Sequence, residues 1–247
     1  TNVNVNVGTS TFQDNLTATT TTISTGTGNF NTVSGTTTSN LQFTNDGTAN
    51  LNRGLTGNVT TTANNKGTLN LVGTGPQTVT GQVGTGGVGG ASLAEVNAGA
   101  NGATSTFAGD VYATNLDVEG TGTVNLGGDF TGTAIRYNAD GTVVVATGND
   151  VNSAITNNTG TDSQGTLTLS GSSTVTGQVG ASGASLKAIN AGATGSTSTF
   201  NSDVYVTNLN MTGTGTVILN SDLTGNVVTT WNQGILTTIG ATQTITG

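Results

Sequence analysis

Short runs in this chain alternate apolar residues with threonine or asparagine. The pattern is clearest in four segments: VNVNV (3–7), TLTL (166–169), NLNM (208–211) and TVILN (216–220). A period of two places successive side chains on opposite faces of an extended strand. We therefore expect short β-strands whose apolar residues point into a core and whose polar residues point out. Helical patterns of period 3.6 are nearly absent, and the abundant Val, Ile and Thr favour strands.

The sequence repeats itself over long distances. The heptapeptide TVTGQVG occurs at 78–84 and again at 174–180. The match extends on both sides into two longer pairs of segments: 68–84 with 166–180, and 91–132 with 184–225. A weaker copy begins the chain, which thus holds about two and a half units of about 95 residues. We expect a single domain over residues 1–247, cut from a longer protein, because the opening TNVNVNVG reads as the middle of a unit.

Differences in spacing between the copies point to a smaller structural unit. The segment from Phe12 to Leu41 is longer than its counterpart from Phe107 to Leu116 by about 20 residues. A second insertion of about 21 residues separates the glycines of the LTG and VTG motifs. Insertions of one size, in a chain of short strands separated by Gly, Asn or Asp, are typical of a parallel β-helix that gains complete turns. We predict about eleven turns of about 22 residues and a rod roughly 50 Å long.

We interpret the repeated heptapeptide as scaffold rather than as a binding site. Val79 and Val175 should point inward, and the glycines two residues later should bend the coil. Val83 and Val179 should then begin the next face. We expect each unit to turn the same corner on the same stack of strands, since an insertion of half a turn would rotate every later strand off its face.

Composition excludes several classes of function. Charged residues are 6% of the chain and the formal net charge is −8; the basic residues are Arg53, Lys66, Arg136 and Lys187. A nucleic-acid partner is not expected, because it requires a basic face. Without His or Cys, the chain lacks the base of a protease triad, the usual zinc ligands and any disulfide. No segment is apolar over enough residues to predict a membrane-spanning helix.

The remaining candidate chemistry rests on the carboxylates, which are ten Asp residues, Glu95 and Glu119. Four aspartates at matching corners of two units are calcium candidates: Asp110, Asp129, Asp203 and Asp222. Asp also favours turns, where it hydrogen-bonds the backbone of its own turn. A catalytic pair for glycoside hydrolysis should occur once rather than in every unit. We predict structural aspartates, with calcium binding as the alternative, and neither catalytic residues nor a cofactor.

Aromatic residues, threonines and loops offer further candidates. The repeated aromatic positions should pack inside the coil or in a groove, with carbohydrate stacking as the alternative: Phe12, Phe107, Phe200, Tyr112 and Tyr205. Runs such as TATTTTIST (17–25) raise ice binding as a function, although we expect that the threonines do not hold one fixed slot in successive turns. TGGVGGAS (85–92) and TNNTGTDSQG (156–165) read as loops that decorate the rod or bind a partner.

The order of the motifs resembles a known family. The unit has the form GTL-x-L-x-G-x-x-x-VTG-x-VG, then ASL-x-x-(V/I)N-x-G, then F-x-x-x-VYATNL, then GTG-x-(V/I)-x-L-x-x-x-(L/F)TG. It is similar to the repeats of autotransporter passenger domains, above all the large surface-antigen adhesins of the rickettsial outer-membrane type. The resemblance covers nearly the whole chain. It implies a right-handed β-helix that is exported to the bacterial surface, either secreted or anchored to the outer membrane, and that mediates adhesion. Only scaffold positions match, so no functional residue carries over.

Three functions follow as hypotheses. The first is an adhesin or its stalk, whose partner is a receptor on a host cell or a neighbouring cell. The second is a self-assembling filament or surface-layer subunit, in which unpaired strands at the ends of the rod recruit the next molecule. The third is a carbohydrate-active or ice-binding solenoid.

Overall fold

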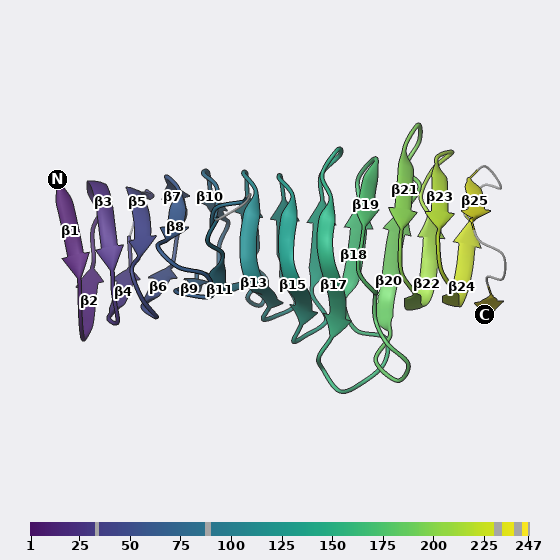
Figure 1. Ribbon diagram of the computed structural model, residues 1–247, viewed down its shortest axis with the longest axis horizontal. Helices are drawn as coiled ribbons and strands as arrows, with labels where there is room; N and C mark the ends of the chain where they lie inside the picture. The colour runs from purple at the N-terminus through teal and green to yellow at the C-terminus, as the bar shows by residue number, and fades with distance from the viewer. Residues whose placement is uncertain (33–34, 87–89, 230–233, 240–243, 247) are drawn as a thin grey trace.

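The protein is a right-handed β-helix of about 12 turns with about 20 residues per turn. The computed structural model describes residues 1–32, 35–86, 90–229, 234–239 and 244–246. Figure 1 shows a rod with the two ends of the chain at its opposite ends. Every pairing between two named strands is parallel in the described residues. These residues include no helix that could cross a membrane.

The strands of the described residues fall into two long hydrogen-bonded sets. The first set contains β1 (Asn2–Val5), β3 (Thr17–Ile23), β5 (Thr37–Phe43), β7 (Leu55–Thr56), β8 (Val59–Thr61), β10 (Gln77–Val79), β12 (Thr104–Phe107), β14 (Thr123–Leu126), β16 (Thr142–Val145), β18 (Thr166–Leu169), β20 (Leu186–Ala191), β22 (Val204–Met211), β24 (Leu223–Thr229) and β26 (Ile245–Thr246). The second set contains β2 (Thr9–Phe12), β4 (Thr27–Phe30), β6 (Thr48–Leu51), β9 (Thr68–Leu71), β11 (Leu93–Ala98), β13 (Val111–Val118), β15 (Phe130–Tyr137), β17 (Val151–Asn157), β19 (Ser173–Val175), β21 (Thr197–Phe200), β23 (Thr216–Leu219) and β25 (Ile235–Thr238).

The longer strands bend and so take part in two stacks. In β13, Val111 pairs with Val83, whereas Leu116 pairs with Val96 of β11. The buried residues of β13 mark the bend, because Val111 and Ala113 alternate in the usual way but the next buried residue is Leu116. The pairing register shifts at similar places in β3, β15 and β22.

Each turn therefore crosses three ladders of stacked strand segments. In chain order, the first ladder runs from β1 through β8, Val83 and the start of β13 to β25. The second runs from β2 through β11 and the end of β13 to β26. The third runs from the start of β3 through β12 and β18 to the end of β24.

Apolar side chains from the three ladders fill the interior as one continuous cluster. Val79, Val175, Val83 and Val179 are all fully buried, as the sequence pattern predicted. Burying one such side chain stabilises the fold by roughly 1.5–3 kcal/mol, but a single turn has nothing to bury it against, so neighbouring turns stabilise each other. The prediction for VNVNV is only partly right, because Val5 is buried whereas Val7 is 77% exposed.

The turns are shorter and more numerous than the sequence spacing predicted. The turn from Val111 to its stacked partner Phe130 is short, whereas the turn from Val83 to its partner Val111 is longer and includes the segment 85–92. The longer turns carry loops, and the motif spacings in the sequence came from several of these loop-bearing turns. The inserted segments are whole turns, as predicted, because β3 and β5 continue the stack without a break in pairing.

The repeat unit is not a whole number of turns. Four pairing steps lead from β2 through β4, β6 and β9 to β11, and β12 is the next strand along the chain. Since β2 and β12 both have the sequence TSTF, one unit spans four turns plus one ladder. The third copy of TSTF, β21, follows β12 by the same step. The three copies thus lie in the second, third and first ladders.

This rotation contradicts the prediction that every unit turns the same corner on the same stack. Val79 lies in the third ladder and its counterpart Val175 in the first, and Val83 and Val179 lie in the first and second. The fold tolerates an offset of one ladder because the three ladders require the same of a strand segment. On each ladder the segment needs an apolar inner face and a parallel neighbour on either side.

The threonines of the run 17–25 hold no fixed slot, as expected, because Thr20 pairs with Asn2 and Asn40, and Thr22 pairs with Asn4 and Gln42. Threonines outside this run do stack in register. Two columns of outward-facing threonine each continue for four turns: Thr9, Thr27, Thr48 and Thr68 in the second ladder, and Thr104, Thr123, Thr142 and Thr166 in the third. Insertions of different lengths had hidden this regularity in the linear sequence.

Candidate functional site

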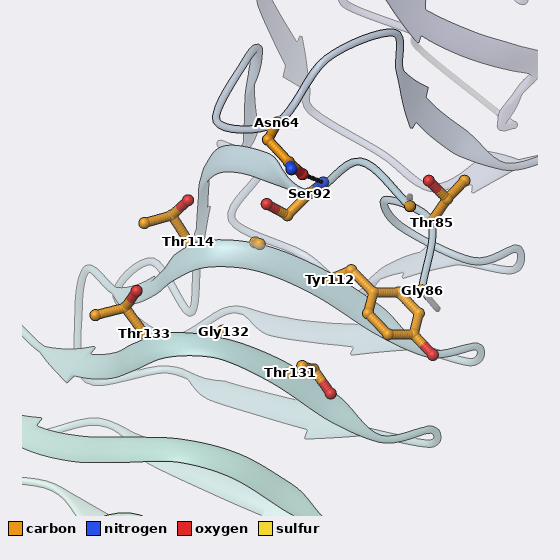
Figure 2. A pocket seen from close by; sticks show the side chains of 11 residues that line it. Asn64, Thr85, Gly86, Ser92, Tyr112, Thr114, Thr131, Gly132 and Thr133 are labelled. Atoms are coloured by element: carbon orange, nitrogen blue, oxygen red, sulfur yellow. Dashed lines mark hydrogen bonds between the residues drawn. The ribbon is translucent and has the colours of Figure 1, made fainter. Parts of the chain in front are cut away.

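A groove lined by Tyr112 opens at the corner between the first and second ladders (Figure 2). Tyr112 pairs in register with Thr131 on the next turn, and Gly132 follows at the bend of β15. A side chain at Gly132 could not be accommodated, because its Cβ would lie 2.0 Å from the carbonyl oxygen of Ala113. Gly132 is one of the residues that line a hollow of about 250 Å³ beside the tyrosine.

Two loops build the rim of the Tyr112 groove. The backbone N–H of Ser92 donates to Asn64 Oδ1 at 3.0 Å, and the hydroxyl of Thr114 donates to Asn65 Oδ1 at 3.0 Å. The second loop passes over the tyrosine ring at Gly86, where a Cβ would lie 2.3 Å from the ring. The groove therefore depends on segments from turns that are distant in sequence. Residues 87–89 of the predicted loop 85–92 lie outside the described residues.

The tyrosine hydroxyl is held by a carboxylate of its own turn. Tyr112 donates to Asp110 Oδ2 at 3.3 Å. Partial burial, followed by the charge of Asp110, raises the pKa of Tyr112 above its usual value. The phenol therefore remains protonated at neutral pH, with one face of the groove offering an aromatic ring and a hydroxyl.

A second groove lies around Tyr205, at the corner between the second and third ladders. Tyr205 pairs with Thr224, and Gly225 occupies the bend, with a hypothetical Cβ only 1.8 Å from the carbonyl oxygen of Val206. Its rim repeats the first, because Ser185 N–H donates to Asp162 Oδ1 at 2.8 Å. The hollow measures about 410 Å³. In Figure 1 the loop after β17 and the loop before β20, which form this rim, project together from one edge of the rod.

The rim of the Tyr205 groove uses the same bonds with different side chains. The hydroxyl of Thr207 donates to Ser163 Oγ at 3.0 Å, as Thr114 does to Asn65. Asn65 and Ser163 share a left-handed backbone, with φ of 58° and 64°. The covering loop closes here through a bridge between Ala181 and Ala184. Two rims built from different side chains thus enclose hollows of different size, each beside a tyrosine.

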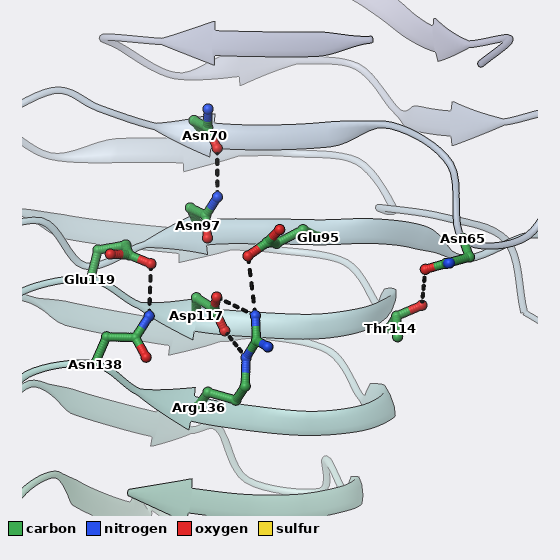
Figure 3. Close-up of polar contacts among 9 residues, drawn as sticks. All are labelled: Asn65, Asn70, Glu95, Asn97, Thr114, Asp117, Glu119, Arg136 and Asn138. Carbon is green, nitrogen blue, oxygen red and sulfur yellow. Dashed lines mark hydrogen bonds and ion pairs between the residues drawn. The ribbon is translucent and has the colours of Figure 1, made fainter. Parts of the chain in front are cut away.

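A charged cluster next to the first groove has no counterpart in the second unit (Figure 3). Arg136 pairs with Asp117, whose side chain is 4% exposed, and with Glu95 Oε1 at 3.1 Å. A hydrogen bond with Asp117, burial and the charge of Asp117 raise the pKa of Glu95. Both carboxylates contact one guanidinium, which differs from the separated pair of a glycoside hydrolase. Asn97 Oδ1 beside them is buried without a hydrogen-bond partner in the described residues.

The four predicted calcium candidates bond to the backbone of neighbouring turns. Asp110 Oδ1 accepts from Asp129 N–H at 3.0 Å, and Asp129 Oδ1 accepts from Asp150 N–H at 2.8 Å. Asp203 and Asp222 form a second series, in which Asp203 Oδ1 accepts from Asp222 N–H at 3.4 Å. The expectation that each Asp would bond its own turn was wrong, because the stacked corner brings the N–H of the next turn within reach.

The structure does not bring the four aspartates together. Asp110 and Asp129 precede the first ladder, whereas Asp203 and Asp222 precede the second. Among the described residues no group of three or more acidic, His or Cys side chains could hold a metal ion. Calcium binding at these corners stays a prediction.

The repeated aromatic positions divide into two classes. Phe107 and Phe200 are buried, and Phe12 stacks on Phe30 with ring centres 5.1 Å apart. Tyr112 and Tyr205 are only half-buried and line the grooves. The sequence analysis grouped the two tyrosines with the phenylalanines and missed the grooves. The signal that could have found them was the repeated DVY motif, which places a polar-ended ring directly after a corner.

Comparison with known proteins gave no match: no family model, no curated protein and no solved structure matches the chain.

Proposed function

We propose that this chain is a non-enzymatic β-helical passenger, secreted or held at a bacterial surface, that acts as an adhesin or as the stalk of one. The observation that carries the proposal is the pair of grooves beside equivalent tyrosines, one around Tyr112 and one around Tyr205. Each is built on strands of a rigid rod and opens to solvent. A site held by strands keeps its geometry better than one held by loops alone.

The chemistry of the chain supports binding rather than turnover. Glu95, whose pKa is raised, is engaged by Arg136, and so is Asp117. Neither groove has more than one carboxylate in its lining among those residues, and the hydroxyl of Tyr112 is held as a neutral donor. Recognition of a surface molecule by aromatic and hydroxyl groups uses such side chains directly.

The experiment is saturation binding of fluorescently labelled, purified protein to cultured epithelial cells and to a panel of bacterial cells. An adhesin binds at least one cell type saturably, and an excess of unlabelled protein displaces it. Static light scattering on the same sample should report a monomer. If the protein binds none of the cell types saturably, the proposal is contradicted. Fibres that grow with protein concentration would instead favour the filament hypothesis.

Ice binding is retained as a second candidate because of the threonine columns. Four threonines in register at the spacing of stacked turns, about 4.8 Å, form a regular row of hydroxyls: Thr9, Thr27, Thr48 and Thr68. This column ends at Thr68, and the next column of threonines lies in the third ladder. Any flat array of threonines is therefore limited to about four turns. A thermal hysteresis measurement tests this candidate: a freezing gap that disappears when Thr27 and Thr48 are changed to Lys would support it.

A further inference from the structure

We propose that the Tyr112 and Tyr205 grooves are equivalent subsites for neutral carbohydrate, placed so that one rod joins two separate glycan chains. The inference rests on the proposed adhesive function and names its ligand class. Its grounds are the lining chemistry, the residues that stay constant between the two copies, and the rotation between them.

The lining of the first groove is neutral and rich in hydroxyl groups. Around the Tyr112 ring lie the side chains of Thr114, Thr131 and Ser92, and the floor is the backbone at Gly132. No charged side chain lines it among the described residues. A ligand that fits must offer hydroxyl groups to these polar partners and an apolar face to the ring. A pyranose ring has both, because its axial C–H groups form an apolar patch within a rim of hydroxyls.

Anionic ligands do not fit the same surface. Three of the four basic residues are engaged in ion pairs and line neither groove: Lys66 with Asp46, Lys187 with Asp140 and Arg136 with Asp117. The net charge of −8 adds a general repulsion toward acidic polymers. A phosphorylated or uronic-acid ligand would find neither a cation nor a favourable potential there.

Four polar residues of the groove are retained between the units, although charged residues beside it are not. Glu95, Asp117 and Arg136 correspond to Ala188, Asn210 and Val228, which removes every charge. The retained groove residues are Ser92 and Ser185, Tyr112 and Tyr205, Thr114 and Thr207, and Thr131 and Thr224. Other lining residues differ, since Asn64, Ala113 and Thr133 correspond to Asp162, Val206 and Asn226. The constant part of the two grooves is the tyrosine with the hydroxyl groups around it, and we assign the ligand contacts to this part.

Scaffold demands account for the tyrosines only in part, since the covering loop packs on the Tyr112 ring at Gly86 but the strand position itself does not require a ring. Both rings are half-buried and their positions face outward from the strand, next to Thr131 and Thr224. A small polar residue would satisfy an outward strand position, as threonine does on the neighbouring turn. The aromatic ring is the part of the groove that a sugar requires and the strand position does not.

The two grooves face different directions. They are separated by one repeat unit, which is four turns and one ladder, or roughly 21 Å along the rod at about 4.8 Å per turn. Because the first groove lies between the first and second ladders and the second between the second and third, the two open at different corners of the rod, and one straight glycan chain on a flat surface cannot occupy both. Two chains approaching from different sides can.

The test uses affinity electrophoresis of the full chain in gels that contain dextran, yeast mannan or xylan, with polygalacturonate as the anionic comparison. Wild-type protein should be retarded by at least one neutral polymer and not by polygalacturonate. Tyr112→Ala and Tyr205→Ala should each remove one subsite, and the double variant should bind about tenfold more weakly or worse. Tyr112→Phe keeps the ring and should retain binding. Thr142→Ala, an outward change on the third ladder, is the matched control, and circular dichroism verifies that every variant is folded.

Agglutination of beads coated with the retarding polymer tests the geometry. Wild-type protein should agglutinate the beads, whereas each single variant should bind them without agglutination because it is monovalent. If the neutral polymer retards the double variant as strongly as the wild type, the assignment of the grooves as glycan subsites is overturned. It is also overturned if no neutral polymer retards the wild type. Agglutination by a monomeric single variant overturns the two-subsite geometry. If the double variant still binds cells saturably, adhesion stands and the glycan subsites fail, so the two proposals are separable.

Discussion

Replacement of Gly165 by alanine tests how the interior is packed. Gly165 has φ of +82°, and a Cβ there would lie 2.5 Å from Cγ of Tyr137, whose ring is fully buried. Gly67 and Phe43 form the same arrangement nearer the start of the chain, with φ of +79° and a Cβ distance of 2.2 Å. The aromatic ring thus lies over a glycine in both places.

The expected loss of folding free energy in Gly165→Ala has two separable parts. A left-handed backbone costs a non-glycine residue about 1–2 kcal/mol. Forcing a methyl group into the packed ring of Tyr137 adds about 1–3 kcal/mol, so Gly165→Ala should lower the free energy of unfolding by about 2–5 kcal/mol. Gly102→Ala is the matched control. Gly102 has φ of +72°, but a Cβ there would meet no atom within 4 Å, so only the backbone part applies.

Urea unfolding followed by far-ultraviolet circular dichroism measures both variants. Gly165→Ala should be less stable than Gly102→Ala by the packing part alone. In a Tyr137→Leu background the additional penalty of Gly165→Ala should shrink, since the smaller side chain leaves room and contacting sites are not additive. Equal destabilisation by the two alanine substitutions would refute the proposed contact between ring and glycine.

Three further outcomes are expected. Deletion of residues 111–129 removes one complete turn and should leave a cooperatively folded β-helix, because Phe130 then takes the place of Val111; loss of the β-sheet signal in circular dichroism would contradict the stacking register. Asp150→Ala should destabilise by about 1–2 kcal/mol in urea unfolding, because Asp150 Oδ1 accepts from the N–H of Thr174 at 2.6 Å. A hydrogen bond with Asp117 and burial raise the pKa of Glu95, against the attraction of Arg136, so the folded state holds this proton more tightly than the unfolded chain. That contribution is complete below the ordinary pKa of about 4.3 and is lost as the pH rises through the folded value. Relative to Glu95→Gln, the wild type should therefore lose stability as the pH rises above about 4.3; a difference that stays constant above that pH would count against a raised pKa.

The fold was predictable because its rules are local. The alternation around Val79 and Val175 places those side chains inward whatever the tertiary context, and the insertion near Phe12 revealed the length of a turn. The ladder on which each segment lies was not predictable in the same way. TVTGQVG is identical in both copies, yet Val79 lies in the third ladder and Val175 in the first. Position around the axis depends on the summed length of all preceding turns, and loops of unequal length alter that sum.

The grooves escaped sequence analysis for a related reason. Tyr112 meets Thr131, Asn64 and Gly86, which come from different turns, and no linear pattern joins these residues. The prediction for the corner aspartates failed in the same manner. Asp110 was expected to bond its own turn, but its acceptor oxygen meets the N–H of Asp129 on the following turn. In a solenoid the nearest neighbours of a side chain are one turn away, and they can be identified only after the register of the turns is known.

The offset of one ladder per repeat unit has a consequence for neighbouring molecules. Units that spanned a whole number of turns would align their identical features as a straight stripe along one side of the rod. Such a stripe favours side-by-side association between parallel rods, since every feature would meet its copy at the same height. With four turns and one ladder per unit, the features instead wind around the axis and return to the same side after three units. A chain can then multiply its binding features by duplication while presenting no continuous edge for association, and the two grooves described here open at different corners of the rod.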